Sequence, residues 1–167
     1  MPRLPMSSIR NFSKHLKAFA TVDPNNLSDK DKGFNLVKGN WTTTKEYKDL
    51  VDPLTGQPMM KYPATQLEEI DPFVDSLKSC PKSGLHNPFK NKERYLMLSE
   101  VNRKVVETMQ DPEVFNFFVK CTQRLAPKSK QQTEAEIKVT VDFYKNFCGD
   151  RVRFLAHSER QPGDHAG

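Results

Sequence analysis

The residue types that most often carry out enzyme chemistry are few in this chain and far apart. Its three cysteines are odd in number and form no Cys-x-x-Cys pattern: Cys80, Cys121 and Cys148. Widely spaced, unpaired cysteines are typical of reduced, partly buried thiols in an internal compartment. The sequence therefore predicts neither a zinc site nor a disulfide framework.

The other groups that could act in catalysis do not combine into a site. The four histidines lie in unrelated segments, away from any Cys, Asp or Glu at metal-ligand spacing: His15, His86, His157 and His165. His157-Ser158-Glu159 joins the residue types of a catalytic triad, but neighbours on one helix point in different directions, which favours coincidence. The glycines form no G-x-G-x-x-G or phosphate-binding loop, so no nucleotide site is predicted.

The paired acidic residues also have a simpler interpretation. Glu68-Glu69 and the pair Glu134 and Glu136 are read as solvated charges and a helix cap. No nucleophile with an adjacent base can be assembled from these residues. We accordingly predict no catalytic, cofactor-binding or metal-binding residue, and the chain as it stands is not expected to be an enzyme.

Composition bounds the kind of fold that must position these residues. The 167 residues suffice for one domain, but the hydrophobic fraction is 36% and there are 12 prolines. With a mean hydropathy of -0.72, this predicts a thin core that neighbouring protein helps to cover. No apolar run reaches the 18 or more residues of a membrane span.

The positive charge is concentrated at the N-terminus. Four basic residues and no acids lie in positions 1–22, and they account for most of the net charge of +5: Arg3, Arg10, Lys14 and Lys17. The remainder is nearly neutral and has no basic run with interleaved aromatics, so we do not expect nucleic-acid binding.

The same N-terminal stretch resembles a targeting segment. Residues 6–20 place apolar and basic side chains on different faces of a helix and contain several serines. This predicts a mitochondrial presequence over 1–22, followed by a polar linker over 23–33. The alternative is a basic helix that is retained and lies on a partner or peripherally on a membrane.

Short strands are expected next, and helices after them. Strands are predicted at 34–38, 46–51 and 58–62, with a turn at Asp52-Pro-Leu-Thr-Gly56 that makes the last two a hairpin. A short helix is predicted at 70–77, and three long helices follow. These begin at an Asn91 cap, at Asp111-Pro112, and at a capping box of Thr133 with Glu136, the last continuing past Gly149.

The predicted fold class is therefore α+β, mainly α, with a short N-terminal β-hairpin followed by three packed helices. Since three apolar helical stripes must face one another, we expect their aromatic residues to form the core where the helices meet. These residues are Phe115, Phe117, Phe118, Phe143, Phe147 and Phe154.

Several motifs resemble the aldehyde dehydrogenase superfamily. Leu36-Val-Lys-Gly-Asn-Trp41 followed by Asp52-Pro-Leu-Thr-Gly56 is similar to the opening of that superfamily. Gly84-Leu-His-Asn-Pro-Phe89 and Glu93-Arg-Tyr-Leu96, within the block 72–100, resemble the plant-type 1-pyrroline-5-carboxylate dehydrogenases more specifically. Further similar stretches are Arg124-Leu-Ala-Pro-Lys-Ser129 with Gln131-Gln132, Asn146-Phe-x-Gly-Asp150, Arg153-Phe-Leu-Ala156 and Pro162-Gly163.

The resemblance, which extends over 34–167, carries its own implications. Members of that family oxidise glutamate semialdehyde to glutamate with NAD in the mitochondrial matrix. They use a cysteine thiolate, an oxyanion hole and a Glu that activates water. The resemblance places all of these, and the NAD-binding elements, beyond the portion that this chain matches, so none of its cysteines is given the nucleophile's role.

Two functions remain open from the sequence. The first is a non-catalytic accessory subunit of a mitochondrial assembly, such as a respiratory complex, with other protein subunits as its partners, located in the matrix or on the matrix face of the inner membrane. The second is a fragment of an NAD-dependent 1-pyrroline-5-carboxylate dehydrogenase. We expect no bound cofactor in this chain under either interpretation.

Overall fold

The computed structural model describes residues 12–80, 92–149 and 151. Several sequence predictions lie outside this part, namely those on His86, His157, His165, Phe154 and the Asn91 cap. In chain order the elements are α1 (Lys14–Phe19), β1 (Asn35–Val37), β2 (Asn40–Thr42), β3 (Tyr47–Val51), β4 (Pro58–Pro63), a 3-10 turn η1 (Leu67–Glu69), α2 (Asp71–Lys78), α3 (Lys92–Thr108), α4 (Pro112–Leu125) and α5 (Lys130–Asn146).

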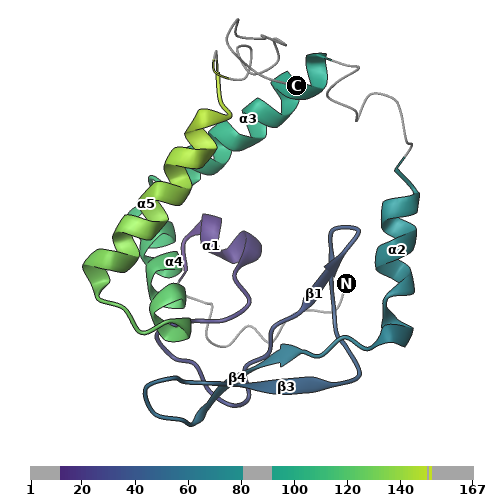
Figure 1. Cartoon of the computed structure of the whole chain (residues 1–167), viewed down its shortest axis with the longest axis vertical. Coiled ribbons are helices and arrows are strands. Elements are labelled where there is room, and N and C mark those ends of the chain that lie inside the picture. Colours follow the sequence, from purple (N-terminus) through teal and green to yellow (C-terminus); the bar gives the residue numbers. More distant parts are fainter. Residues whose placement is uncertain (1–11, 81–91, 150, 152–167) are drawn as a thin grey trace, which may run out of the picture.

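The elements form an open arrangement rather than stacked layers. Figure 1 shows α3, α4 and α5 along one side, the β3–β4 pair across the bottom and α2 on the opposite side. Helix α5 packs against both α3 and α4, while α2 packs against β1. The predicted fold class, mainly helical with short antiparallel strand pairs ahead of packed helices, is confirmed.

The predicted hairpin is present as the antiparallel pair β3–β4. Its register pairs Tyr47 with Pro63 and runs to Val51 opposite Pro58, with an irregularity beside Val51. The turn closes through the Gly56 N–H, which donates to the Asp52 carbonyl at 2.8 Å. Gly56 has a φ of 70°, a conformation that favours glycine, so the turn chemistry read from the sequence is the cause of this hairpin.

A second hairpin was not predicted. Strands β1 and β2 pair antiparallel, with Leu36 opposite Trp41. The two residues between them, Lys38 and Gly39, have φ values of 49° and 76°. Two consecutive positive φ values are typical of the tight turn that matches strand twist, and the Lys-Gly sequence signals it only weakly. The predicted strand at 34–38 is thus one half of a pair.

The helix boundaries show which local sequence signals were sufficient to predict where a helix begins. Helix α4 begins as predicted, with the Asp111 carboxylate accepting a hydrogen bond from the Glu113 N–H at 2.8 Å. The predicted start of α5 at Thr133 is wrong, because Ser129 caps the helix and forms a capping box with Gln132. Thr133 is fully buried one turn inside.

The end of α5 also differs from the prediction. The helix ends at Asn146 instead of continuing past Gly149, whose φ is 59°. A glycine in this conformation is a common way for a helix to stop, because other residues adopt it at a cost. The Phe147 N–H instead bonds back to the carbonyls of Lys145 and Tyr144.

The buried core lies at α1 and α4, not where three long helices were expected to share aromatics. Leu16, Ala20 and Val114 are 1–5% exposed, and they form one buried cluster. Phe117 and Phe118 pack against it together with aromatic residues of α1.

The expected aromatic core of the three long helices is therefore wrong for several of its members. Phe143 of α5 and Phe147 at its C-cap are 62% and 50% exposed. Phe115 is half-buried and lies near Val106 and Val141. The sequence identified aromatic residues that pack, but the helix that covers two of them is the N-terminal one.

None of the described helices is long and apolar enough to cross a membrane. The division of the chain into 1–22, 23–33 and 34–167 stays a prediction.

Candidate functional site

Of the three described cysteines, Cys121 has the surroundings of an unreactive thiol. All three thiols are free, with Cys80 exposed and the other two half-buried. Burial of Cys121, helped by the nearby carboxylate of Asp23, raises its pKa to about 11, which keeps it protonated at neutral pH. The Cys148 thiol, just after α5, donates to the Tyr144 carbonyl of that helix at 3.2 Å. The raised pKa of Cys121 opposes formation of the thiolate that covalent catalysis needs.

Histidine and metal chemistry have little support in the described residues. His15 is the histidine that the structure describes, and it is exposed on α1. Within residues 12–80, 92–149 and 151, no three His, Cys, Asp or Glu side chains gather in a way that could hold a metal ion.

Glu69, interpreted from sequence as a solvated charge, is instead a junction. Its carboxylate accepts hydrogen bonds from the Gln66 N–H at 3.1 Å, the Thr44 hydroxyl at 2.7 Å and the Lys45 N–H at 2.9 Å. These bonds lower the pKa of Glu69 because they favour its ionised form. The residue joins η1 to the segment before β3.

The motifs that carried the family resemblance also meet at junctions between elements. Asp52, in the β3–β4 turn, accepts from the Leu54 N–H at 2.8 Å and lies 3.4 Å from the Arg124 guanidinium at the end of α4. The Asp52 side chain is 13% exposed and the Arg124 side chain 40%. The structure therefore brings together two motifs that are 72 residues apart in sequence.

Two further motif segments have comparable structural roles. Ser129 and Gln132 cap α5, as described above. At the other end of that helix, the Gly149 N–H donates to the Ser99 hydroxyl of α3 at 2.9 Å, and Ser99 is buried. These contacts fix α5 against α3 at one end and set its direction at the other. In the described residues, the motifs that resemble the dehydrogenase family therefore have structural roles, as helix caps and as contacts between elements.

An apolar groove is the feature that sequence reasoning missed. It has a volume of about 520 Å³ and lies among four helices. Its lining includes Phe19 of α1, Val101 and Val105 of α3, Phe118 of α4, and Val141 and Tyr144 of α5. The apolar stripes on α3 and α5 were its signal, but we expected those stripes to close on each other.

Helices α3 and α5 also carry exposed apolar residues, some of which line the groove. On α3, four apolar residues are 40–51% exposed, namely Leu96, Met97, Leu98 and Val101. On α5, Val139, Phe143 and Tyr144 are 40–62% exposed, and Phe147 at its C-cap is 50% exposed. Isolated exposed apolar residues are normal, but Val101 and Tyr144 are both exposed and line the apolar groove, which makes the groove an open apolar surface. The groove can accept apolar side chains of another segment or protein.

Comparison with known proteins gives this surface a context. No protein-family model matches the chain. A flax (Linum usitatissimum) protein described as a probable aldehyde dehydrogenase is 47% identical over 160 residues, which cover 95% of this chain and 29% of that protein. The Arabidopsis thaliana protein named mitochondrial delta-1-pyrroline-5-carboxylate dehydrogenase 12A1 is 45% identical over 155 residues, covering 92% of this chain and 28% of that protein.

The chain is therefore homologous to a segment of plant aldehyde dehydrogenases. It spans less than a third of the length of these relatives. Within that class, the resemblance to plant 1-pyrroline-5-carboxylate dehydrogenases, read from the motifs, is confirmed.

Proposed function

We propose that the described part of this chain is a structural, non-catalytic portion of a 1-pyrroline-5-carboxylate dehydrogenase. Its helices hold an apolar groove against the remainder of that enzyme, where NAD binding and aldehyde oxidation take place. The observation that carries this proposal is the uncovered apolar surface of α3 and α5, in a chain homologous to such enzymes over nearly its whole length.

The balance of buried and exposed apolar residues supports this role. Among the described residues, six hydrophobic side chains are buried, whereas sixteen large hydrophobic side chains are exposed. Burial of apolar surface stabilises a fold by about 25 cal/mol per Å². A further protein surface that covered these exposed residues would therefore stabilise this part of the chain. The rest of a dehydrogenase is the occupant that homology favours.

The polar contacts support a structural role too. The Asp52–Arg124 pair, the Glu69 junction and the Ser99–Gly149 bond each connect elements that are distant in sequence. None places a base beside a thiol, and Cys121 is held in its protonated form. In this proposal the chemistry is performed by residues of the parent enzyme outside this segment.

A mitochondrial location is part of the proposal. The Arabidopsis relative is named as mitochondrial, and residues 1–22 are basic and free of acids. The matrix is the compartment in which an enzyme of this class would meet its substrate. Fractionation of cells, with the chain followed by antibody, tests this location directly.

The decisive experiment separates the dehydrogenase from another host. Mitochondrial extract is run on a native gel and then on a denaturing gel, and an antibody to residues 112–149 detects the chain. We expect the antibody to follow a polypeptide of aldehyde dehydrogenase length that co-migrates with NAD-dependent pyrroline-5-carboxylate oxidation. Detection away from that activity contradicts the proposal.

An accessory subunit of another mitochondrial assembly is the second candidate. The same exposed apolar residues favour it, because they fit foreign subunits as well as a parent enzyme. Its signature in this experiment is a short polypeptide that migrates with a large complex lacking dehydrogenase activity. Mass spectrometry of that band would identify the host, and a respiratory complex is the one expected from the sequence.

A further inference from the structure

Helix α1 is part of the core, although it lies in the segment with the composition of a leader. Leu16 is 1% exposed and Ala20 is 5% exposed, and both pack with Val114 of α4. These two are a third of the six hydrophobic residues buried in the described part of the chain. A segment that is removed after import is not expected to supply this share of a core.

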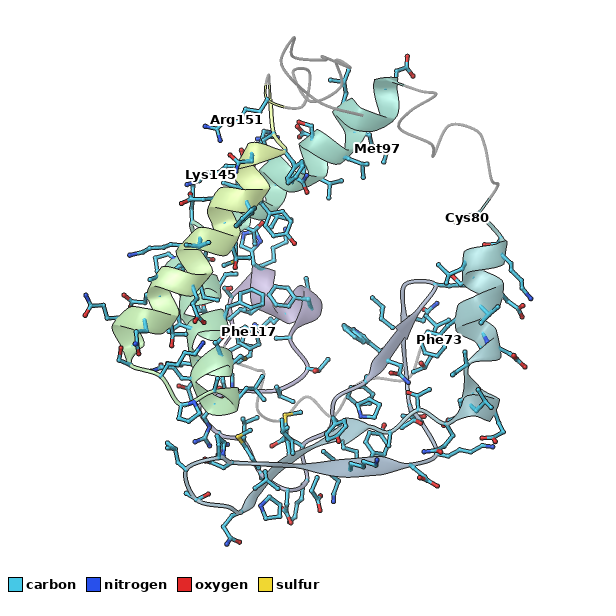
Figure 2. All side chains as sticks on the ribbon, in the orientation of Figure 1. Phe73, Cys80, Met97, Phe117, Lys145 and Arg151 are labelled. Carbon is cyan, nitrogen blue, oxygen red and sulfur yellow. The ribbon has the colours of Figure 1, made fainter. Side chains whose placement is uncertain are left out.

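Aromatic packing joins α1 to α4 on either side of this cluster. Phe12 lies edge-on to Phe117 with ring centroids 6.0 Å apart, and Phe19 lies edge-on to the same ring at 5.9 Å. Phe19 also stacks on Phe118 at 5.7 Å. Figure 2 marks Phe117 where α4 and α1 come together. The packing therefore begins at Phe12, before the helix itself.

Polar contacts fix the start of α1 in the same place. The Ser13 N–H donates to the Glu113 carboxylate at 2.9 Å, across 100 residues of sequence. The Ser13 hydroxyl caps the helix by accepting from the Leu16 N–H. Because Glu113 is also in the first turn of α4, the N-termini of both helices are tied together. This contact is lost if the chain begins at Lys14.

We propose that α1 is a permanent element of the mature protein and that removal of any leader cuts the chain before Phe12. The cut is a hydrolysis by a leader peptidase, in which water adds across one peptide bond and leaves a carboxylate on the leader and an amine on the mature chain. The presequence-like pattern then has two uses. Its basic residues direct import, and its apolar face from Phe12 onward builds the fold.

If α1 is permanent, two other fates of this helix are excluded: removal by a later cut, and permanent attachment to a membrane. A cut near position 22 would remove Phe12, Leu16, Phe19 and Ala20 together, and would expose Val114 and the Phe117 and Phe118 rings. A helix that lies permanently on a membrane would need the same apolar face that α4 covers. Both would require a different partner for α4.

The first test is the N-terminus of the mature protein. The full-length protein is purified from mitochondria of its own cells, and its N-terminal peptide is identified by mass spectrometry after amine labelling. We expect a first residue at or before Phe12, including an uncut start. A first residue at Ser13 or later overturns the proposal. Every possible first residue therefore either supports the proposal or contradicts it.

The second test is whether α1 stabilises the fold. In the full-length protein expressed without import, Leu16→Asp is compared with His15→Asp, which adds the same charge at an exposed neighbour on the same helix. We expect Leu16→Asp to lower the unfolding midpoint by at least about 5 °C or to abolish soluble protein, and His15→Asp to change it by less than about 1 °C. Leu16→Ala gives an intermediate loss.

Equal midpoints for Leu16→Asp and His15→Asp would overturn the proposal, because a buried charge cannot be tolerated at a packed core position. If Leu16→Asp yields no soluble protein while His15→Asp does, the core role of Leu16 is supported. If Leu16→Ala leaves the unfolding midpoint unchanged, the core role of Leu16 is refuted. Neither measurement depends on dehydrogenase activity, so failure here and failure of the proposed function are distinguishable.

Discussion

At the scale of single residues, the carboxylate of Glu69 shows how a charge interpreted as solvent-exposed becomes structural. Three donors from two segments converge on it, and they lower its pKa. A depressed carboxyl pKa stabilises the fold above the ordinary value of 4.5, and this contribution is lost as pH falls through the folded value. The sign follows because the unfolded chain takes up the proton first.

Replacing this carboxylate should therefore have a pH-dependent effect. We expect Glu69→Gln to lower the unfolding midpoint at pH 7, and the gap from the unaltered protein to narrow as pH falls below about 4.5. Glu68→Gln, at the exposed neighbour, is the matched control and should leave the midpoint unchanged at both pH values. Thermal melts across pH 3 to 7 measure both. A gap that is constant with pH would contradict the hydrogen-bonded role.

At the scale of elements, the caps decide where the long helices begin. Asp111 accepts from the Glu113 N–H and satisfies one of the unpaired donors at the start of α4. Because α4 carries Val114 and the aromatic contacts to α1, fraying of its first turn also weakens the core.

The cap of α4 can be tested with a conservative pair. We expect Asp111→Ala to cost about 1 kcal/mol of unfolding free energy, since alanine offers no acceptor. Asp111→Asn should cost only a few tenths of that, because asparagine caps about as well as aspartate. Denaturant unfolding of the full-length protein provides both values. Equal losses for the two variants would mean that the charge matters and the hydrogen bond does not.

The elements also show where sequence reasoning was sufficient. The β3–β4 hairpin and the start of α4 were predicted because Asp-Pro-x-Thr-Gly and Asp-Pro act locally, within a few residues. The start of α5 was missed because Ser129 and Gln132 form a capping box as well suited as Thr133 and Glu136, and tertiary burial of Thr133 favoured the first. The β1–β2 turn was missed because Lys38 adopts a positive φ that its type rarely has.

At the scale of the whole molecule, the arrangement leaves its apolar groove open. The aromatic stripe of α5 could be read from sequence, but its partner could not, because periodicity identifies an apolar face without saying what covers it. The contact between α1 and α4 joins residues about 100 positions apart in sequence, so no local pattern predicts it. For the same reason the groove, which needs four helices at once, was beyond sequence reasoning.

The groove gives a test of assembly. Val101 lines it and is 51% exposed, so Val101→Asp leaves the buried core intact while placing a charge on the proposed contact surface. We expect this variant of the full-length protein to lose at least about ten-fold of its assembled form on a sizing column. Asn116→Asp, on the exposed side of α4, is the matched control and should assemble normally.

Assembly of Val101→Asp at the level of the unaltered protein would show that the groove is not a contact surface. Reduced soluble protein for both variants would point to a general loss of folding instead. Comparing the unfolding midpoints of the separated species distinguishes the two outcomes.

The sequence separation of the Ser13–Glu113 contact also has a consequence for the protein during its synthesis. Helix α1 leaves the ribosome about 100 residues ahead of the helix that covers it. At 5–20 residues per second, this leaves the apolar face of α1 without its intramolecular partner for about 5–20 s. During that interval a chaperone or an import receptor can bind the face, and once α4 has docked it is hidden. The order of translation thus leaves the apolar face of α1 accessible first and buried in the core later.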